Sequence, residues 1–391
     1  MAVLDAPSNL GLQPPTPGSV PGCAKAPGAL RDHNLVARLA AADAGCVTPP
    51  RYDPGDWRPG DGVCQAVEVA DYSRRLADRL GVLLDADRFP VVLGGDCSIL
   101  LGSALALRRR GVADGRRYGL VFIDGHTDFR HPGNAQYVGA AAGEDLALVT
   151  GRGQSRLTDI ERLRPYLRES DVVVLGIRDH DEYRMDITAA GIPHRTVPVL
   201  RTEGMPRTAA WAVEMLADTA GFWVHLDTDV LDPTVLPAVD APTEGGIGYG
   251  ELENLLADLV AAPACLGIEV TVFDPDYDLD GEYARELTDA LVAGLRPLWS
   301  PYRDWSDAAA AGYALDDPDG DTGHDTGHRD SDDDTDGRAG RADTGHGVLG
   351  AAAPDRHHTL TVAVPPAAGD TARTADTVTT TDPATTADPA G

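Results

Sequence analysis

The chain has 391 residues, of which 42% are hydrophobic, and a formal net charge of −29 at pH 7. This length suits one large domain or two smaller ones. The negative charge argues against nucleic acid as a partner, because phosphates would repel the chain, but it is compatible with a cationic small molecule. No apolar run approaches the ~20 residues of a membrane helix, and the first residues lack the pattern of a signal peptide. Five cysteines without a Cys-x-x-Cys pair fit reduced thiols, so we expect a cytoplasmic protein.

Residues 1–108 predict two strands and three helices. Leu76, Leu80 and Leu84 form one apolar stripe of a helix, because they recur every four positions. A short apolar run that ends in glycines is typical of a buried strand instead. In chain order we expect a strand near residues 3–4, a helix at 34–43, a loop at 47–61, a helix at 67–84, a strand at 91–93, and a helix at 98–108 with Ser98 as its N-cap.

Residues 109–305 predict four further strands that alternate with four helices. The strands are expected at residues 120–123, 172–177, 222–226 and 265–272. The helices are expected at residues 158–169, 206–219, 249–261 and 282–297. Such alternation argues for a parallel sheet with helices on both faces. We therefore predict an α/β fold for residues 1–305, a single domain of three α/β/α layers around a mainly parallel sheet.

After Trp305 the composition changes. Residues 306–391 consist largely of Asp, Gly, Thr, Ala and Pro. Low hydrophobicity and high charge cannot offset the entropy lost on ordering, so we predict a disordered, acidic tail. Its Asp-Thr-Gly-His repeats could bind metal weakly, although a low-complexity tail is the favoured interpretation. Deleting the tail should leave the melting temperature nearly unchanged.

Polar residues that can bind metal follow two of the predicted strands. The strand at 120–123 runs into Asp124, His126 and Asp128, whose side chains can converge because alternate residues of extended chain point the same way. The strand at 222–226 runs into Asp227 and Asp229. Each stretch alone also fits a solvated turn. Together they would crowd carboxylates at one edge of the sheet, which costs energy unless a cation neutralises them. The pattern therefore indicates a dinuclear metal site.

A third motif, Gly94-Gly95-Asp96-Cys97-Ser98, follows the strand at 91–93. The three motifs resemble those of the ureohydrolase superfamily of arginases, agmatinases and formiminoglutamases. In that family Gly-Gly-Asp-His-Ser, Asp-Ala-His-x-Asp and Ser-x-Asp-x-Asp-x-x-Asp-Pro occur in this order. The resemblance covers roughly residues 1–305 and implies an arginase-like fold.

The resemblance also implies a cofactor and site residues. In the family two Mn²⁺ ions activate water for attack on the carbon of a guanidinium or formimino group. Asp128 would in addition be catalytic, by passing a proton to the leaving amine. Glu269 would be catalytic and substrate-binding, by pairing with the guanidinium, and Asp181 would meet a substrate amino group. The implied metal ligands are Cys97, Asp124, His126, Asp128, Asp227 and Asp229.

Two positions depart from the family pattern. Cys97 stands where a histidine ligand is usual, and a soft thiolate suits Mn²⁺ poorly, so one metal rather than two, or another metal, is possible. Ala142 aligns with the histidine that shuttles protons. Side chains that could replace that histidine are Gln136, Tyr137, Glu144 and His131.

We therefore predict a manganese-dependent hydrolase that cleaves a C–N bond of a guanidino or amidine compound and releases urea. By resemblance it acts on a small molecule and forms a homo-oligomer, with no nucleic acid or membrane partner. The alternative is a catalytically impaired, metal-binding pseudoenzyme or binding protein of the same fold. A structural role for the acidic tail is the third and least favoured interpretation.

Overall fold

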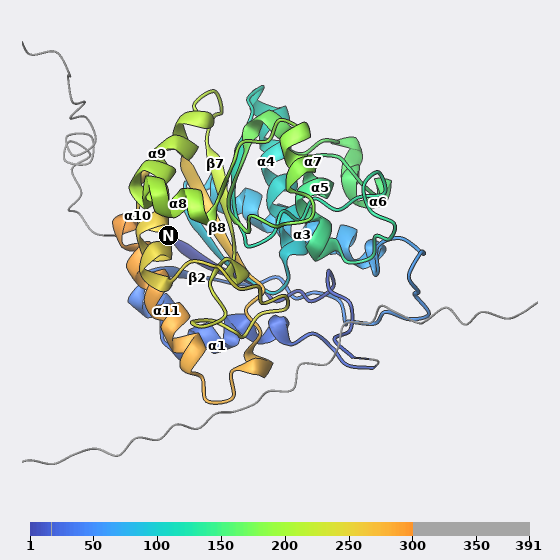
Figure 1. The fold of residues 1–391 in the computed structure, drawn as a ribbon, viewed down its shortest axis with the longest axis horizontal. Coiled ribbons are helices and arrows are strands. Elements are labelled where there is room, and N and C mark those ends of the chain that lie inside the picture. The colour runs from blue at the N-terminus through green and yellow to red at the C-terminus, as the bar shows by residue number, and fades with distance from the viewer. Residues whose placement is uncertain (17, 300–391) are drawn as a thin grey trace, which may run out of the picture. The chain divides into compact units, whose positions relative to one another are not determined.

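A computed structural model describes residues 1–16 and 18–299, which are built around an eight-stranded sheet (Figure 1). The strands lie in the order β2-β1-β3-β8-β7-β4-β5-β6, and every neighbouring pair is parallel. This arrangement confirms the parallel sheet predicted from the alternating pattern. The strands are β1 Ala2–Ala6, β2 Ala42–Cys46, β3 Pro90–Gly94, β4 Gly119–Ile123, β5 Val172–Ile177, β6 His194–Thr196, β7 Phe222–Asp227 and β8 Cys265–Thr271.

Helices cover both faces of the sheet, which confirms the three predicted layers. Helices α3 to α7 pack on one face, and α1, α2 and α8 to α11 pack on the other (Figure 1). The helices are α1 Ala26–Asp32, α2 Leu35–Arg38, α3 Ala66–Asp85, α4 Leu100–Asp114, α5 Asp145–Val149, α6 Ser155–Thr158, α7 Arg184–Ala189, α8 Val197–Glu203, α9 Met205–Met215, α10 Tyr249–Ala261 and α11 Glu282–Gly294.

The central strands are apolar on both faces because each face carries its own core. In β4, Leu120 and Phe122 belong to the core under α3 to α7, whereas Val121 and Ile123 belong to the core under α8 to α11. All four side chains are fully buried. A continuous apolar run is therefore what a strand in the middle of this sheet requires.

Two predicted helices are wrong, one in its extent and the other altogether. The helix expected at 34–43 ends at Arg38, since Ala40 has a φ of 49° and the following residues form the edge strand β2. The helix expected at 158–169 is absent, because Glu161 and Arg162 have φ values of 60° and 62°, which α-helix does not allow. The short elements α7, β6 and α8 were not predicted at all.

The predicted N-cap at Ser98 is also wrong. The turn after β3 is a 3₁₀ helix over Cys97–Ile99 that leads into α4. Asp96 is its N-cap, with its carboxylate accepting a hydrogen bond from the Ser98 N–H at 2.8 Å. A second hydrogen bond, from the Ser8 hydroxyl at 2.7 Å, ties this turn to the loop after β1.

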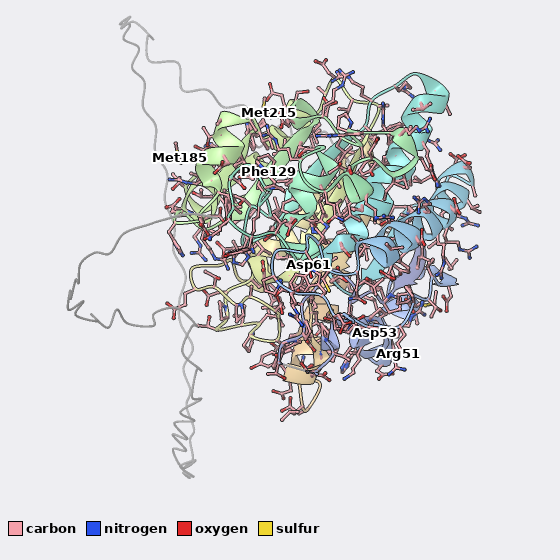
Figure 2. The ribbon with its side chains drawn as sticks, turned by 90° about the vertical axis from the view of Figure 1, so that its right-hand side faces the viewer. Arg51, Asp53, Asp61, Phe129, Met185 and Met215 are labelled. Carbon is pink, nitrogen blue, oxygen red and sulfur yellow. The ribbon has the colours of Figure 1, made fainter. Side chains whose placement is uncertain are left out.

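The loop predicted at 47–61 is present, and Figure 2 labels Arg51, Asp53 and Asp61 on it. Local carboxylate contacts shape this loop. Asp53 accepts a hydrogen bond from the Gly55 N–H at 3.0 Å, and Asp61 accepts one from the Arg58 N–H at 3.0 Å. These contacts satisfy backbone donors that have no partner in a helix or strand.

The predicted boundary at Trp305 and the predicted tail at 306–391 lie outside the described residues. Within residues 1–16 and 18–299, no helix combines the length and the hydropathy that a membrane span requires.

Candidate metal centre

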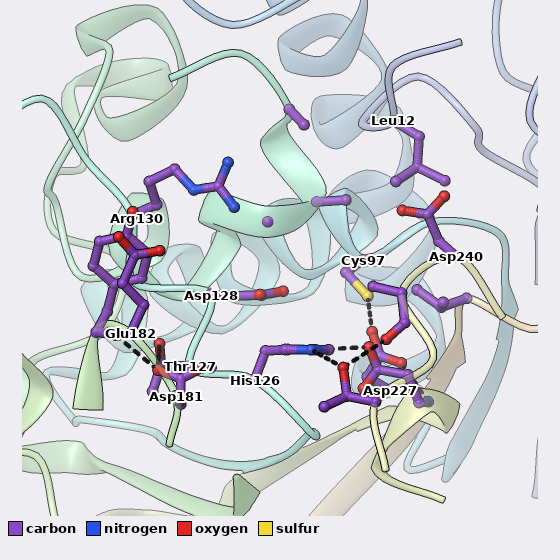
Figure 3. A pocket seen from close by; sticks show the side chains of 18 of the residues that line it. Leu12, Cys97, His126, Thr127, Asp128, Arg130, Asp181, Glu182, Asp227 and Asp240 are labelled. Atoms are coloured by element: carbon purple, nitrogen blue, oxygen red, sulfur yellow. Dashed lines mark hydrogen bonds and ion pairs between the residues drawn. The ribbon is translucent and has the colours of Figure 1, made fainter. Parts of the chain in front are cut away.

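The carboxyl ends of the central strands open onto one cavity of about 600 Å³ (Figure 3). Strands β3, β8, β7 and β4 are neighbours in the sheet, so the residues that follow them meet at one edge. Five of the six predicted metal ligands line this cavity, and the sixth, Asp124, lies fully buried next to them. The lining ligands are Cys97, His126, Asp128, Asp227 and Asp229.

Asp124, His126 and Asp229 form a first group of possible ligands. The Nδ1 atom of His126 lies 2.9 Å from Oδ2 of Asp229 and 3.7 Å from Oδ1 of Asp124. One donor atom from each residue lies within 4.8 Å of the others. Oδ2 of Asp124 is fully buried and has no hydrogen-bond partner among the described residues. Such a carboxylate oxygen is costly unless a cation or proton satisfies it.

Cys97, Asp128 and Asp227 form a second group with the same spacing. The Cys97 thiol donates to Oδ2 of Asp227 at 2.7 Å and to the Thr271 hydroxyl at 3.1 Å. Asp128 lies between this contact and the Thr127–Asp181 pair (Figure 3). The structure thus brings the predicted ligands together in two groups at one cavity wall.

Backbone hydrogen bonds hold the two acidic loops in place. Oδ1 of Asp124 accepts from the His126 N–H at 2.5 Å, and Oδ1 of Asp227 accepts from the Asp229 N–H at 2.7 Å. The Gly125 N–H joins the loops by donating to Asp229 at 3.0 Å. A Cβ at Gly125 would lie 2.8 Å from the Asp229 carbonyl oxygen, so the two loops approach each other closely here.

Burial and mutual repulsion dominate the electrostatics of the site. Burial, and then neighbouring carboxylates, raise the pKa of Asp124 and of Asp227 well above the ordinary value. Burial also raises the pKa of Asp128, to about 7. Burial alone would lower the pKa of His126, but the Asp229 carboxylate raises it to about 10. Divalent cations would neutralise this charge, and carboxylate, imidazole and thiol donors fit such ions.

Comparison with known proteins identifies the family of the fold. The profile of the arginase family matches residues 4–295. The chain belongs to the arginase family. It is 32% identical to an arginase of Brevibacillus brevis over 220 residues, which are 56% of the chain and 72% of that relative. It is 27% identical to a formimidoylglutamase of Aeromonas salmonicida over 267 residues, which are 68% of the chain and 77% of that relative. The arginase structure of Bacillus caldovelox superposes with a TM-score of 0.66 at 27% identity, over 75% of this chain and 97% of that one.

Asp181 lines the cavity of this arginase-family chain, but its carboxylate is already engaged. It accepts hydrogen bonds from the hydroxyl of Thr127 at 2.8 Å, from the N–H of Thr127 at 3.1 Å and from the N–H of Tyr183 at 2.9 Å. Asp181 therefore supports the loop after β4 and also faces the cavity.

Arg178 is buried and donates to the backbone carbonyls of several loops, among them those of Asp229 and Thr243.

Glu269 does not lie where the family resemblance implied. It is fully buried in β8 and is not among the residues that line the cavity. One of its oxygens lies 2.8 Å from Nδ1 of His225, and the other accepts from the Ser103 hydroxyl at 2.5 Å. Val272, three residues later, lines the cavity instead. This position does not support a contact between Glu269 and substrate.

Ala142 lines the cavity, so the position aligned with the proton-shuttle histidine offers only a methyl group. None of the four predicted substitutes is among the residues that line it. His180 and Arg130 do line it, and both are exposed. His180 directly precedes the predicted substrate residue Asp181, but nothing in the sequence distinguished it as a site residue.

Proposed function

We propose that the chain is a metal-dependent hydrolase that cleaves a C–N bond of a small guanidino or amidine compound, with Mn²⁺ at the harder of its two ligand groups. The observation that carries this proposal is the meeting of both ligand groups at one cavity in an arginase-family fold. Mn²⁺ suits Asp124, His126 and Asp229, because carboxylate and imidazole are harder donors than a thiolate.

Bound divalent ions would lower the pKa of water and stabilise negative charge at this wall of the cavity. The residues of the chain supply the proton transfer. Asp128 lines the cavity beside His126, so its carboxylate can take a proton from the attacking water and return it to the leaving amine (Figure 3). His180, on the same cavity, can exchange that proton with solvent.

The charge of the cavity favours a substrate that is cationic at one end. Besides the candidate ligands, three carboxylates line the cavity, from Asp181, Glu182 and Asp240. Arg130 provides the opposite charge, and Figure 3 shows its guanidinium on the side of Asp128 away from His126. A guanidino acid carries both complementary charges, since its carboxylate can pair with the Arg130 guanidinium.

Product release from a substrate panel tests this function. The full chain, loaded with Mn²⁺, is offered arginine, 4-guanidinobutyrate, agmatine and formiminoglutamate, and urea or formamide is measured. We expect turnover of a guanidino acid. Arg130→Gln should raise KM at least about tenfold for guanidino acids and leave agmatine unaffected, since only the acids carry the matching carboxylate. A loaded chain that turns over none of these compounds would contradict the proposal.

A pseudoenzyme is the second candidate, and Ala142 favours it, because no imidazole stands at the shuttle position. It predicts metal binding with full occupancy and no product from any compound of the panel. The same experiment therefore separates the two functions.

A further inference from the structure

A fully buried polar cluster lies behind the cavity wall, and two of its three members have no part in the proposed hydrolysis. Its members are Cys97 after β3, Asp145 at the start of α5 and His225 in β7, none more than 1% exposed. One donor atom from each lies within 4.8 Å of the others. Cys97 also lines the cavity, whereas Asp145 and His225 are not among the lining residues.

The ring of His225 is held in one orientation. Its Nδ1 atom lies 2.8 Å from Oε1 of Glu269, whose other oxygen accepts from the Ser103 hydroxyl. The Phe122 ring stacks on the imidazole, with centroids 4.8 Å apart and planes 11° apart. If Nδ1 donates its hydrogen to Glu269, the lone pair of Nε2 is free. A carboxylate that orients the far nitrogen in this way is typical of metal-binding histidines.

The atoms that face each other inside the cluster have no hydrogen-bond partners among the described residues. These atoms are Nε2 of His225 and both carboxylate oxygens of Asp145. Nε2 lies 3.8 Å from Oδ2 of Asp145, which is too far for a hydrogen bond. Buried polar atoms normally have partners, so this gap between a nitrogen and a carboxylate needs an explanation. A cation between them would satisfy all three atoms.

The donor types indicate which cation fits. A thiolate, an imidazole and a carboxylate are ligands that Zn²⁺ binds tetrahedrally, whereas Mn²⁺ prefers harder donors. We propose that Cys97, Asp145 and His225 hold a thiophilic divalent cation of the zinc type, with Glu269 and Ser103 as the positioning residues of His225. The site shares Cys97 with the second ligand group of the cavity. The proposal concerns binding only and stands whether or not the chain hydrolyses a guanidino compound.

Cobalt absorption tests this site, because a Co²⁺–thiolate bond absorbs in the near ultraviolet. The full chain is freed of metal by chelation and titrated with Co²⁺. We expect a charge-transfer band that saturates at one equivalent per chain, that Zn²⁺ abolishes by displacement and that is absent in Cys97→Ser. Asp145→Asn and His225→Gln should each weaken the Co²⁺ affinity reported by the band at least about tenfold, and Glu269→Gln about tenfold or more.

Two variants serve as matched controls. Cys265→Ser removes another buried thiol and should keep the band, and Asp229→Ala removes a ligand of the harder group and should also keep it. Asp145→Asn is isosteric and loses no hydrogen bond, so circular dichroism should show its metal-free fold unchanged.

Two results would overturn the proposal. A band of unchanged affinity in both Asp145→Asn and His225→Gln would mean that the cation binds Cys97 from the cavity side, with Asp128 and Asp227. No band in the unsubstituted chain would mean that Cys97, Asp145 and His225 hold no cation. Neither result bears on turnover of the substrate panel.

Discussion

Asp232 follows Asp227 and Asp229 in the same motif, but its role is structural. Its carboxylate accepts from the N–H and hydroxyl of Thr234 at 3.0 and 2.7 Å, and from the N–H groups of Gly245 and Gly246 at 2.8 and 3.1 Å. The hydrogen bonds from Thr234, and then those from the glycines, lower the pKa of Asp232 to about 2. One side chain thus joins two loops beside the cavity.

Asp232→Asn should lower the free energy of unfolding at pH 7 by about 1 kcal/mol, because charged hydrogen bonds at a partly exposed site are lost. The folded pKa lies below the ordinary value, so this stabilisation is complete above about pH 4 and is lost as the pH falls towards 2. Urea unfolding at several pH values measures it. A difference between the two proteins that grows towards acidic pH would contradict this account.

His180 should be the group that exchanges protons with solvent, since it lines the cavity where Ala142 offers none. His180→Gln should lower kcat about 10²-fold and leave metal content unchanged. His131→Gln is the matched control, because that imidazole is not among the lining residues. Equal kcat values for His180→Gln and the unsubstituted chain would remove His180 from the mechanism.

The position of the Glu269 side chain could not be predicted from the sequence. The sequence predicted the strand correctly, but a strand presents alternate residues to opposite faces, so the pattern alone does not fix where the Glu269 side chain lies. In the structure Glu269 pairs with His225 across neighbouring strands. The buried cluster at His225 could not be predicted, because Cys97, Asp145 and His225 come from three distant segments that carry no common motif.

At the scale of elements, the turn after β3 depends on close backbone packing. A Cβ at Gly95 would lie 1.6 Å from the Ser8 carbonyl oxygen, which belongs to the loop after β1. The Asp96 N–H donates to that same carbonyl at 3.0 Å, so the two loops cannot separate without losing the contact. This packing places Cys97 at the cavity wall.

Gly95→Ala should therefore lower the free energy of unfolding by about 2–3 kcal/mol, as expected for overpacking against backbone. The control is Gly28→Ala in α1, where a Cβ would meet nothing within 4 Å. That change should raise stability by roughly 0.5–1 kcal/mol, because alanine favours helix. Thermal unfolding of both variants measures their stability relative to the unsubstituted chain. Equal changes in stability for Gly95→Ala and Gly28→Ala would show that the turn after β3 can relax around the added Cβ.

The elements that the sequence predicted best are those buried on both sides. Strands β4, β5 and β7 have continuous apolar runs and agree with the prediction within a residue. The edge strand β2 was missed because most of its residues are exposed, which leaves no apolar pattern to read. The false helix at 158–169 failed because its positive φ values at Glu161 and Arg162 are set by the tertiary structure, not by residue type.

At the scale of the whole molecule, bound metal should be part of the stability of the fold. A cation that binds only the folded chain stabilises it by RT ln(1 + [L]/Kd), about 2.7 kcal/mol at 100 times Kd. Chelation should therefore lower the melting temperature of the unsubstituted chain by several degrees. Asp229→Ala, which should retain only one of the two ions, should respond less. Equal decreases in melting temperature for the two proteins would indicate that the chelator does not act through the metal at this site.

The metal content of the purified full chain tests the central claim most directly. After loading with Mn²⁺ and Zn²⁺ and exhaustive dialysis, elemental analysis should find two ions per chain. Asp229→Ala should retain one, and Asp240→Asn, which alters a cavity carboxylate outside both ligand groups, should retain two. A chain that holds no metal after dialysis, or an Asp229→Ala variant that still holds two ions, would contradict the account.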